Sequence, residues 1–283
     1  MATCYRHPGR ETGVACSNCG RPICPDCMTS SPVGMRCPEC ARHTTKVRTI
    51  RPNTRRGYEV TIVLIAINVI AFFAEGSGVL SLTGATNSSW LLNHGDLFSA
   101  YVSGQSHLIG INTHEYYRLL TSGFLHLDIL HIAFNMYVLY WVGRLLEPAI
   151  GRPRYIAIYF TGLLAGSLGV MIASPLSPTA GASGAIFGLM GAAFYEAHRR
   201  GVDQVRNQLL LLIVVNLVLS ASLPDISLGA HIGGLIGGGL ATLAFHQADR
   251  IRSSALGWAA CGALAAVSVL GAILIAHGTS FTQ

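Results

Sequence analysis

Residues 181–198 read GASGAIFGLMGAAFYEAH, an apolar stretch that opens on a serine between small residues and ends before two arginines. From Ser183 to His198 it has only 16 residues, fewer than the roughly 20 that a helix needs to cross a bilayer. A helix that starts inside a membrane is tolerated where its free backbone donors line a protein cavity or water. The stretch therefore predicts a short membrane helix whose serine lies below the outer surface.

The remainder of the chain has the composition of a membrane protein. Of 283 residues 51% are hydrophobic and 11% are charged, whereas a soluble domain carries roughly 25% charged residues. Each apolar stretch must satisfy its own backbone as a helix in lipid, so we expect an all-α polytopic membrane protein with seven crossings. The other six stretches are Tyr58 to Glu75, Leu127 to Glu147, Tyr155 to Ser174, Val205 to Ser222, Leu228 to His246 and Ser254 to Ala276.

Arginines distinguish the two sides of this expected bundle. They follow the second, fourth and sixth stretches, whereas the loops of residues 76–112, 175–182 and 223–227 contain no Lys or Arg. The positive-inside rule then places the N-terminus in the cytoplasm. Because topology explains the net charge of +6, a nucleic-acid partner is not expected. In the long first loop, the apolar pieces Trp90 to Leu92 and Leu97 to Tyr101 are expected in the outer membrane interface.

Polar residues are costly inside a membrane, and four of them fall at one expected depth. His131 and Asn135 lie one helical turn apart on the second stretch, Ser183 opens the fourth, and His231 lies near the start of the sixth. A hydroxyl, an imidazole and further donors aimed at one point are the groups that acyl transfer through an oxyanion requires.

Glycines favour a close approach of the fourth and sixth stretches. Gly184, Gly188 and Gly191 face one way, and Gly234 and Gly238 form a small-xxx-small pair, which lets two helix backbones approach. Taken singly, a serine at a helix start is usually only a cap. A histidine in a membrane helix is more often a buried hydrogen-bond partner or part of a proton path than a catalytic base. The prediction of an acyl-transfer site therefore rests on the four polar residues taken together, not on any one of them.

Three motifs resemble the rhomboid intramembrane proteases. They are Gly181-Ala-Ser183-Gly184, His131-x-x-x-Asn135 and Ala230-His231-x-x-Gly234, in the order and topology of that family. The resemblance implies a six-helix core at residues 58–248, with a seventh helix and tail at residues 249–283. It implies that Ser183 is the nucleophile, that His231 is its base, and that His131 and Asn135 hold the oxyanion.

The same resemblance implies the substrate and the location. We expect an intramembrane endopeptidase that cleaves membrane proteins with a single transmembrane helix. It is expected to be an integral protein of a bacterial plasma membrane, with its active site open to the extracytoplasmic side. A catalytically silent, client-binding relative is the alternative. A small transporter that uses the polar residues as a path is a second alternative.

Two positions depart from the common pattern of that family. Tyr117-Arg118 stands where many members have Trp-Arg, and Phe187 stands where many have tyrosine. Phe187 lies one turn after Ser183 and is expected to pack on His231. Arg118 is either an anchor at the lipid headgroups or a residue that structures the first loop.

The N-terminal residues 1–43 have the spacing of a zinc-binding domain. Four pairs of ligands stand there, namely Cys4 and His7, Cys16 and Cys19, Cys24 and Cys27, and Cys37 and Cys40. Eight ligands make two tetrahedral structural zinc sites. Disulfides are the competing interpretation, but thiols stay reduced in the cytoplasm. His43 is a possible substitute ligand.

The pairing of these ligands is open from spacing alone, because sequential and interleaved sites are both possible. The spacing resembles small B-box-like zinc fingers, which implies the interleaved form, with Cys4, His7, Cys24 and Cys27 at one site. A basic linker at residues 44–57 follows, next to the inner leaflet of the lipid bilayer. The zinc domain is expected to bind a cytoplasmic protein partner or to regulate the protease.

Overall fold

The computed structural model describes residues 2–31, 34–42, 57–74, 94–102, 108–223 and 226–279. The chain divides into two compact units, Met1–Thr54 and Arg55–Gln283. His43, the expected basic linker up to Arg56 and the piece from Trp90 to Leu92 lie outside the described residues.

In the described part of the larger unit, seven helices match the seven apolar stretches. They are α2 (Glu59–Ala74), α5 (Ile129–Ile150), α6 (Arg152–Ala173), α7 (Ser183–Arg199), α8 (Asp203–Ser222), α9 (Leu228–Arg250) and α10 (Ser254–Gly278). Five of them are long and apolar enough to cross a membrane. The shorter two are α2, with 16 residues, and α7, with 17 residues. This is an all-α polytopic membrane protein, and its fourth helix is short as predicted.

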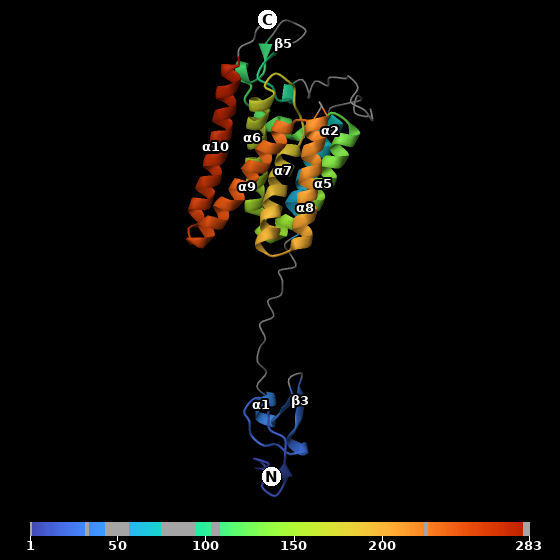
Figure 1. Ribbon diagram of the computed structural model, residues 1–283, viewed down its shortest axis with the longest axis vertical. Coiled ribbons are helices and arrows are strands. Elements are labelled where there is room, and N and C mark those ends of the chain that lie inside the picture. The colour runs from blue at the N-terminus through green and yellow to red at the C-terminus, as the bar shows by residue number, and fades with distance from the viewer. Residues whose placement is uncertain are drawn as a thin grey trace. The chain divides into compact units, whose positions relative to one another are not determined.

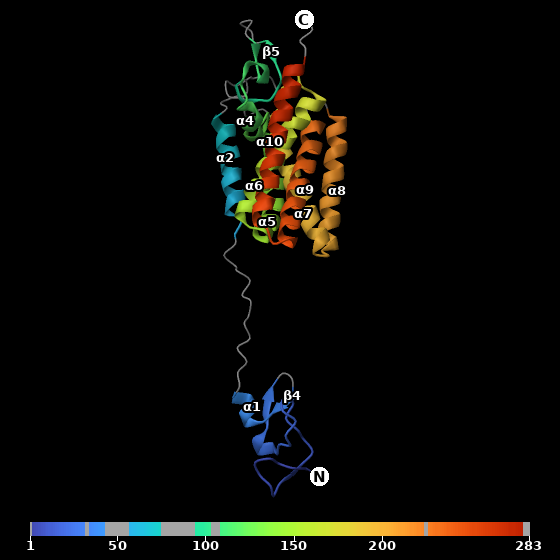
Figure 2. The ribbon, with the colours of Figure 1, turned by 90° about the vertical axis from the view of Figure 1, so that its left-hand side faces the viewer.

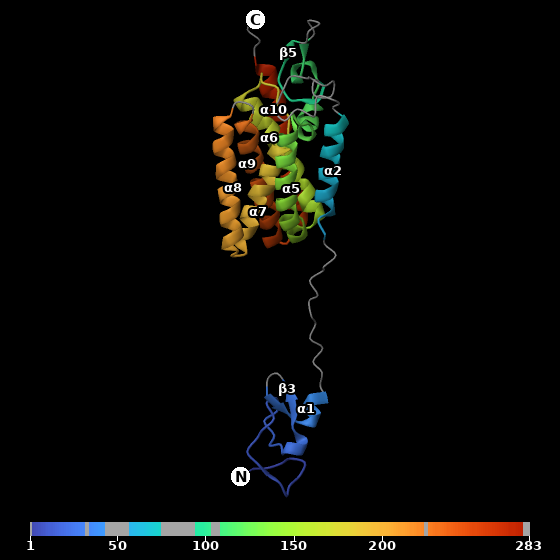
Figure 3. The same ribbon diagram turned by 90° about the vertical axis from the view of Figure 1, so that its right-hand side faces the viewer.

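Helix α6 lies between its neighbours and contacts α7, α9 and α10. Figure 1 shows α10 at the edge of the bundle beside α9 and α6. Figures 2 and 3 show α2 and α8 at opposite edges of the bundle. The main hydrophobic core lies along α5, α6 and α7, around Leu139, Ile158, Tyr159 and Leu189, each of which is fully buried.

Helices α7 and α9 pack backbone to backbone, as the glycine pattern predicts. A Cβ at Gly234 would collide with the carbonyl oxygen of Gly184, and a Cβ at Gly238 would collide with Gly188. Missing side chains are what permit helices in membranes to approach this closely. The starts of the two helices are thereby brought side by side.

The first membrane helix is fastened to the end of α5 by a buried carboxylate. Glu147 accepts hydrogen bonds from the backbone N–H groups of Val60 at 3.0 Å and Thr61 at 2.8 Å, and from the Thr61 hydroxyl at 2.7 Å. The first N–H groups of a helix lack partners within the helix, so a carboxylate is favourable there. Glu147 thus satisfies the start of α2 from another helix.

The loop between α2 and α5 folds over one end of the bundle. Its described elements are β5 (Tyr101–Val102), β6 (Leu108–Ile109), η3 (Ile111–Thr113), α4 (Arg118–Thr121) and η4 (Ser122–Phe124). Strand β5 pairs with β6 in antiparallel fashion. Leu97, Phe98 and Ala100 are at most 3% exposed. These three side chains of the piece expected in the membrane interface are covered by protein rather than open to lipid.

The smaller unit consists of two short hairpins and two short helical segments. Strand β1 (Ala2–Thr3) pairs with β2 (Glu11–Thr12), and β3 (Thr29–Ser31) pairs with β4 (Gly34–Arg36). The helical segments are η1 (Pro25–Cys27) and α1 (Pro38–Arg42). Its buried hydrophobic cluster consists of five cysteines and Ile23, so little apolar surface is available to stabilise this unit.

Candidate active site

Ser183 is the first residue of α7, and a glycine turn holds it beside His131. Gly181 has a φ of +138°, a conformation that residues with side chains rarely adopt. A Cβ at Gly181 would lie 2.9 Å from His131 Nε2 and 3.9 Å from Ser183 Oγ. The Gly181 N–H donates to the carbonyl oxygen of Ser122 at 2.8 Å. The serine hydroxyl and the His131 ring therefore face the same small space.

His131 and Asn135 occupy the first turns of α5, as the motif predicts. The side chain of Asp128 caps the helix by accepting a hydrogen bond from the His131 N–H at 2.7 Å, which is why α5 begins at Ile129 rather than at Leu127. The Asn135 amide donates to the His131 carbonyl oxygen at 2.9 Å. A side-chain amide has two N–H donors, and this hydrogen bond uses one of them.

His231 is buried near the start of α9, where a serine of α8 contacts its ring. Ser220 Oγ lies 2.6 Å from His231 Nδ1 and donates to the Asn216 carbonyl oxygen, also at 2.6 Å. A hydroxyl has one proton and a carbonyl can only accept, so the proton shared with Ser220 comes from His231 Nδ1. In a neutral imidazole the other nitrogen, Nε2, is then an acceptor. Ser220 therefore selects the tautomer in which Nε2 can take a proton.

Phe187 packs on the face of this histidine ring. The two rings are stacked, with centroids 4.1 Å apart and an interplanar angle of 14°. The packing expected for Phe187 is confirmed. Since Phe187 lies one turn after Ser183, the stack brings the His231 ring to the face of α7 that carries the serine.

The serine and the histidine lie on adjoining helix starts without a direct hydrogen bond within the described part of the chain. A Cβ at Gly184 would lie 3.4 Å from the carbonyl oxygen of Ala230, so the residues next to Ser183 and His231 touch. Catalytic hydrogen bonds are often long in the absence of substrate and tighten in the complex. The arrangement is therefore compatible with a dyad.

A small cavity of about 20 Å³ lies behind the start of α7. Gly181, Gly184, Ser122, Ser167 and Ala230 are among the residues that line it. A cavity of this size has room for about one water molecule. The start of this short helix thus borders a protein cavity, as predicted from its length, and Ser122, Ser167 and Thr179 supply hydroxyl groups among otherwise apolar walls.

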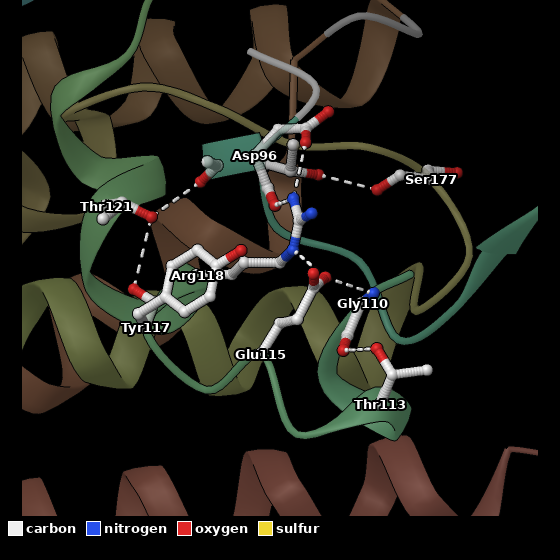
Figure 4. Close-up of polar contacts among 10 residues, drawn as sticks. Asp96, Gly110, Thr113, Glu115, Tyr117, Arg118, Thr121 and Ser177 are labelled. Atoms are coloured by element: carbon white, nitrogen blue, oxygen red, sulfur yellow. Dashed lines mark hydrogen bonds and ion pairs between the residues drawn. The ribbon is translucent and has the colours of Figure 1, made fainter. Parts of the chain in front are cut away.

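The loop that covers this site is organised around a buried arginine (Figure 4). Arg118 is fully buried, and its Nε donates to Glu115 at 2.7 Å. Its Nη1 donates to the carbonyl oxygen of Asp96 at 2.9 Å and to the Asp96 carboxylate at 3.1 Å. Its guanidinium also lies over the Phe98 ring, 4.6 Å from the centroid. Of the two alternatives for Arg118, the structure favours the residue that structures the first loop.

The residue next to Asp96 ties this arginine cluster to the segment that leads into Ser183. The backbones of Leu97 and Thr179 exchange hydrogen bonds at 2.8 Å and 3.0 Å. Burial raises the pKa of the Asp96 carboxyl to about 6, although the neighbouring Arg118 charge opposes the shift. The charge of Asp96 therefore changes in a pH range where an ordinary aspartate is already ionised.

The smaller unit contains two groups of four metal-binding side chains. One consists of Cys4, His7, Cys24 and Cys27, and the other of Cys16, Cys19, Cys37 and Cys40. Within each group the ligand atoms all lie within 4.8 Å of one another. This is the interleaved arrangement, in which each site joins two ligand pairs that are separated along the chain.

The spacing of the ligand atoms fits tetrahedral zinc. Around zinc, Zn–S bonds of about 2.3 Å place two sulfurs about 3.8 Å apart, and a nitrogen and a sulfur about 3.6 Å apart. Cys19 and Cys37 have their sulfurs 3.8 Å apart. His7 Nδ1 lies 3.3 Å from the sulfur of Cys24 and 3.5 Å from that of Cys27. All eight residues can therefore hold two metal ions.

Comparison with known proteins identifies relatives of the larger unit. Residues 113–248 match the family described as Rhomboid domain. Rhomboid protease GluP of Bacillus subtilis (strain 168) is 35% identical over 188 residues, which are 65% of this chain and 34% of GluP. YdcA of the same organism is 30% identical over 134 residues, which are 46% of this chain and 67% of YdcA.

A plant protein is similar over a comparable length. RHOMBOID-like protein 7 of Arabidopsis thaliana is 34% identical over 135 residues, 45% of this chain and 42% of that protein. The chain spans about a third of the length of GluP, the relative that it matches over 188 residues.

Proposed function

This chain belongs to the rhomboid family, and from that premise we propose that it is a serine endopeptidase that cleaves transmembrane segments of membrane proteins. The observation that carries the proposal is the direct backbone contact between α7 and α9, which brings Ser183 and His231 to adjoining helix starts. A nucleophile and a base on rigid elements, beside further donors, are the groups that acyl transfer needs.

In the proposed reaction, Ser183 Oγ attacks the carbonyl carbon of the scissile peptide and passes its proton to His231 Nε2. The contact between His231 Nδ1 and Ser220 supports this step, because it leaves Nε2 as the proton acceptor. When the C–N bond breaks, His231 returns the proton to the leaving amine. Water then attacks the acyl-enzyme ester and releases the second product.

The negative charge on the tetrahedral oxygen would be held by three kinds of donor. We assign this role to the His131 ring, the Asn135 amide and the Ser183 backbone N–H. The last lies at the start of α7, where the helix dipole also favours negative charge. Donors that are fixed before the reaction stabilise the oxyanion without reorganising. His131 then acts as a donor, not as a base.

Cleavage of a reconstituted single-span membrane protein tests the dyad. Ser183→Ala and His231→Ala should each lower the rate of product formation by roughly 10³-fold or more, because either change removes a reacting group. Ser222→Ala and His198→Ala are matched controls at exposed positions and should cleave as the wild type does. Wild-type rates in Ser183→Ala or in His231→Ala would refute the assigned dyad.

We further propose the orientation that the arginines indicate. The N-terminus would lie in the cytoplasm of a bacterium, and the starts of α5, α7 and α9 would face the extracytoplasmic side. This leaves the smaller unit in a reducing compartment, which suits thiolate ligands. Substrates would be membrane proteins with a single transmembrane helix, and the smaller unit is assigned to a cytoplasmic protein partner.

The two ligand groups of the smaller unit are proposed to hold one structural zinc ion each. Closed four-ligand sites of cysteine and histidine leave no position for substrate, so these ions would stabilise the fold and take no part in cleavage. Metal analysis of the purified full chain should find two zinc ions per molecule. Cys24→Ser should lower this to one, whereas Cys261→Ser, in α10, should leave two. Two ions in Cys24→Ser would contradict the assigned ligands.

A further inference from the structure

A second cavity lies at the end of the bundle away from Ser183. It measures about 400 Å³, and its walls come from the end of α5, the start of α6 and the ends of α7 and α9. Since Ser183, His131 and His231 lie at the starts of α7, α5 and α9, this cavity is at the opposite ends of the same three helices. We call it the basal pocket.

The basal pocket is lined by more positive than negative charges. Its arginines are Arg154, Arg199, Arg200 and Arg250, and its acids are Glu196 and Asp249. The general rule that arginines gather on the cytoplasmic side of a membrane protein explains their sign. It does not explain why arginines from three helices converge on one cavity.

Two of these arginines are already occupied by the acids. Arg154 makes a bidentate pair with Asp249, with distances of 2.7 Å and 2.6 Å. Arg200 donates to Glu196 at 2.8 Å and to the carbonyl oxygen of Ala149 at 3.1 Å. These interactions join α6 to α9 and α7 to α5, and the residues that make them form walls of the basal pocket.

Two arginines, Arg199 and Arg200, lie near the single carboxylate of Glu196. Only 6% of its side chain is exposed, and it contacts His246 as well as Arg200. Arg199 lies 3.7 Å away from it, beyond ordinary hydrogen-bond distance. Arg250 has no ion pair with any residue that the structure describes. Arg199 and Arg250 therefore keep donors for a ligand.

We infer that the basal pocket binds a phosphate-bearing anion. The forked guanidinium group matches the oxygens of a phosphate in geometry and charge. The C-terminal ends of α5, α7 and α9 carry partial negative charge, which by itself would disfavour an anion. At the end of α5, Arg200 offsets this effect by donating a hydrogen bond to the carbonyl oxygen of Ala149. The volume suits a small molecule or a single headgroup. Both a soluble phosphate compound and the phosphodiester of an anionic lipid have this chemistry.

The two available arginines give the proposal a direct test that does not depend on proteolysis. The full chain is purified in detergent, and binding of phosphatidylglycerol is followed by native mass spectrometry during titration. Each arginine near an anionic group contributes roughly a fivefold gain in affinity. Arg250→Gln should therefore weaken binding about fivefold, and Arg199→Gln with Arg250→Gln should weaken it about thirtyfold.

A control double variant distinguishes the effect of the pocket arginines on binding from the effect of the protein's net charge. Arg144→Gln with Arg206→Gln removes two charges from α5 and α8, outside the pocket, and should change the affinity by less than about threefold. Arg250→Gln breaks no ion pair in the described residues, so it keeps the test valid if the double variant unfolds. Equal affinities for wild type, Arg250→Gln and the double variants would overturn the proposal.

Inorganic phosphate identifies the source of the anion. Suppose that millimolar phosphate displaces phosphatidylglycerol from the wild type, and that the pocket variants bind neither phosphatidylglycerol nor phosphate. A lipid headgroup then occupies the site. If phosphate stabilises the wild type against thermal unfolding but not Arg250→Gln, and no phosphatidylglycerol is retained, the ligand is a soluble anion. Failure of both probes would overturn the proposal.

Discussion

At the scale of single residues, the proposed reaction depends on Ser220, the side chain that contacts His231 Nδ1. This contact, made by the Ser220 hydroxyl, leaves Nε2 as the acceptor that the proposed reaction needs. Ser220→Ala should lower kcat about tenfold, the factor that corresponds to one lost hydrogen bond. KM should change little, because the contact is remote from substrate binding. Kinetics on the single-span substrate measure both values.

Two further variants distinguish positioning from packing at this residue. Ser220→Thr keeps the hydroxyl and should restore kcat. Ser222→Ala removes another hydroxyl of α8, one that donates to Val218, and should leave kcat unchanged. If Ser220→Thr is as slow as Ser220→Ala, the hydroxyl does not position His231.

The sequence indicated Ser183 and His231, the residues of the proposed dyad, but missed Ser220. Ser183 and His231 stand in motifs with fixed spacing, and the pairing of Phe187 with His231 follows from helical periodicity. Ser220, Ser222 and Ser268 all lie in apolar helices and all donate to a carbonyl four residues earlier. No local signal separates the one that touches a histidine, because that contact depends on how α8 packs on α9.

At the scale of elements, the stability of the loop before α5 depends on the charge of Asp96. Burial makes the folded protein hold the Asp96 proton up to a pH of about 6, whereas an unfolded chain releases it near pH 4. The folded state therefore binds more protons in this window, and stability falls as pH rises from about 4 to about 6. Asp96→Asn, which mimics the neutral form, should flatten this part of the curve.

Thermal unfolding of the two proteins between pH 4 and pH 7 provides the measurement. Asp203→Asn, which replaces an exposed aspartate at the start of α8, is the control and should follow the wild type. Parallel curves for wild type and Asp96→Asn would show that Asp96 does not titrate in this range.

The burial of Leu97, Phe98 and Ala100 shows a limit of prediction for this loop. Hydropathy cannot distinguish a segment that contacts lipid from one that is covered by protein. The decisive interactions are those of Arg118 and the backbone pairing of Leu97 with Thr179, both of which join distant parts of the sequence.

At the scale of the whole molecule, the two units obtain their stability from different sources. The larger has a continuous apolar core, whereas the smaller is built around cysteines. Removal of zinc by a chelator should therefore unfold residues 2–42 and leave the helices of the larger unit folded. Hydrogen exchange of the full chain, with and without chelator, measures both regions. Protection that persists in residues 2–42 would contradict a structural role for the metal.

The seven helices and the eight metal ligands were predictable because apolar stretches and ligand spacing are local patterns, whereas the interleaved pairing followed only from the resemblance to B-box-like zinc fingers. The attachment of α2 to α5 was not, since Glu147 reads as an ordinary acid near a helix end. Its role depends on the N–H groups of Val60 and Thr61, which lie far away in the chain. The same holds for the basal pocket, whose arginines come from three helices.

The direct contact of α7 with α9 restricts how this protein can change over evolution. Where two backbones touch, even one added methyl group would separate them and draw the Ser183 helix away from His231. Substitution of Gly188, Gly234 or Gly238 should therefore be poorly tolerated. Adaptation to new substrates should instead accumulate in the loop before α5 and on the lipid-facing surfaces, which can vary without moving the dyad.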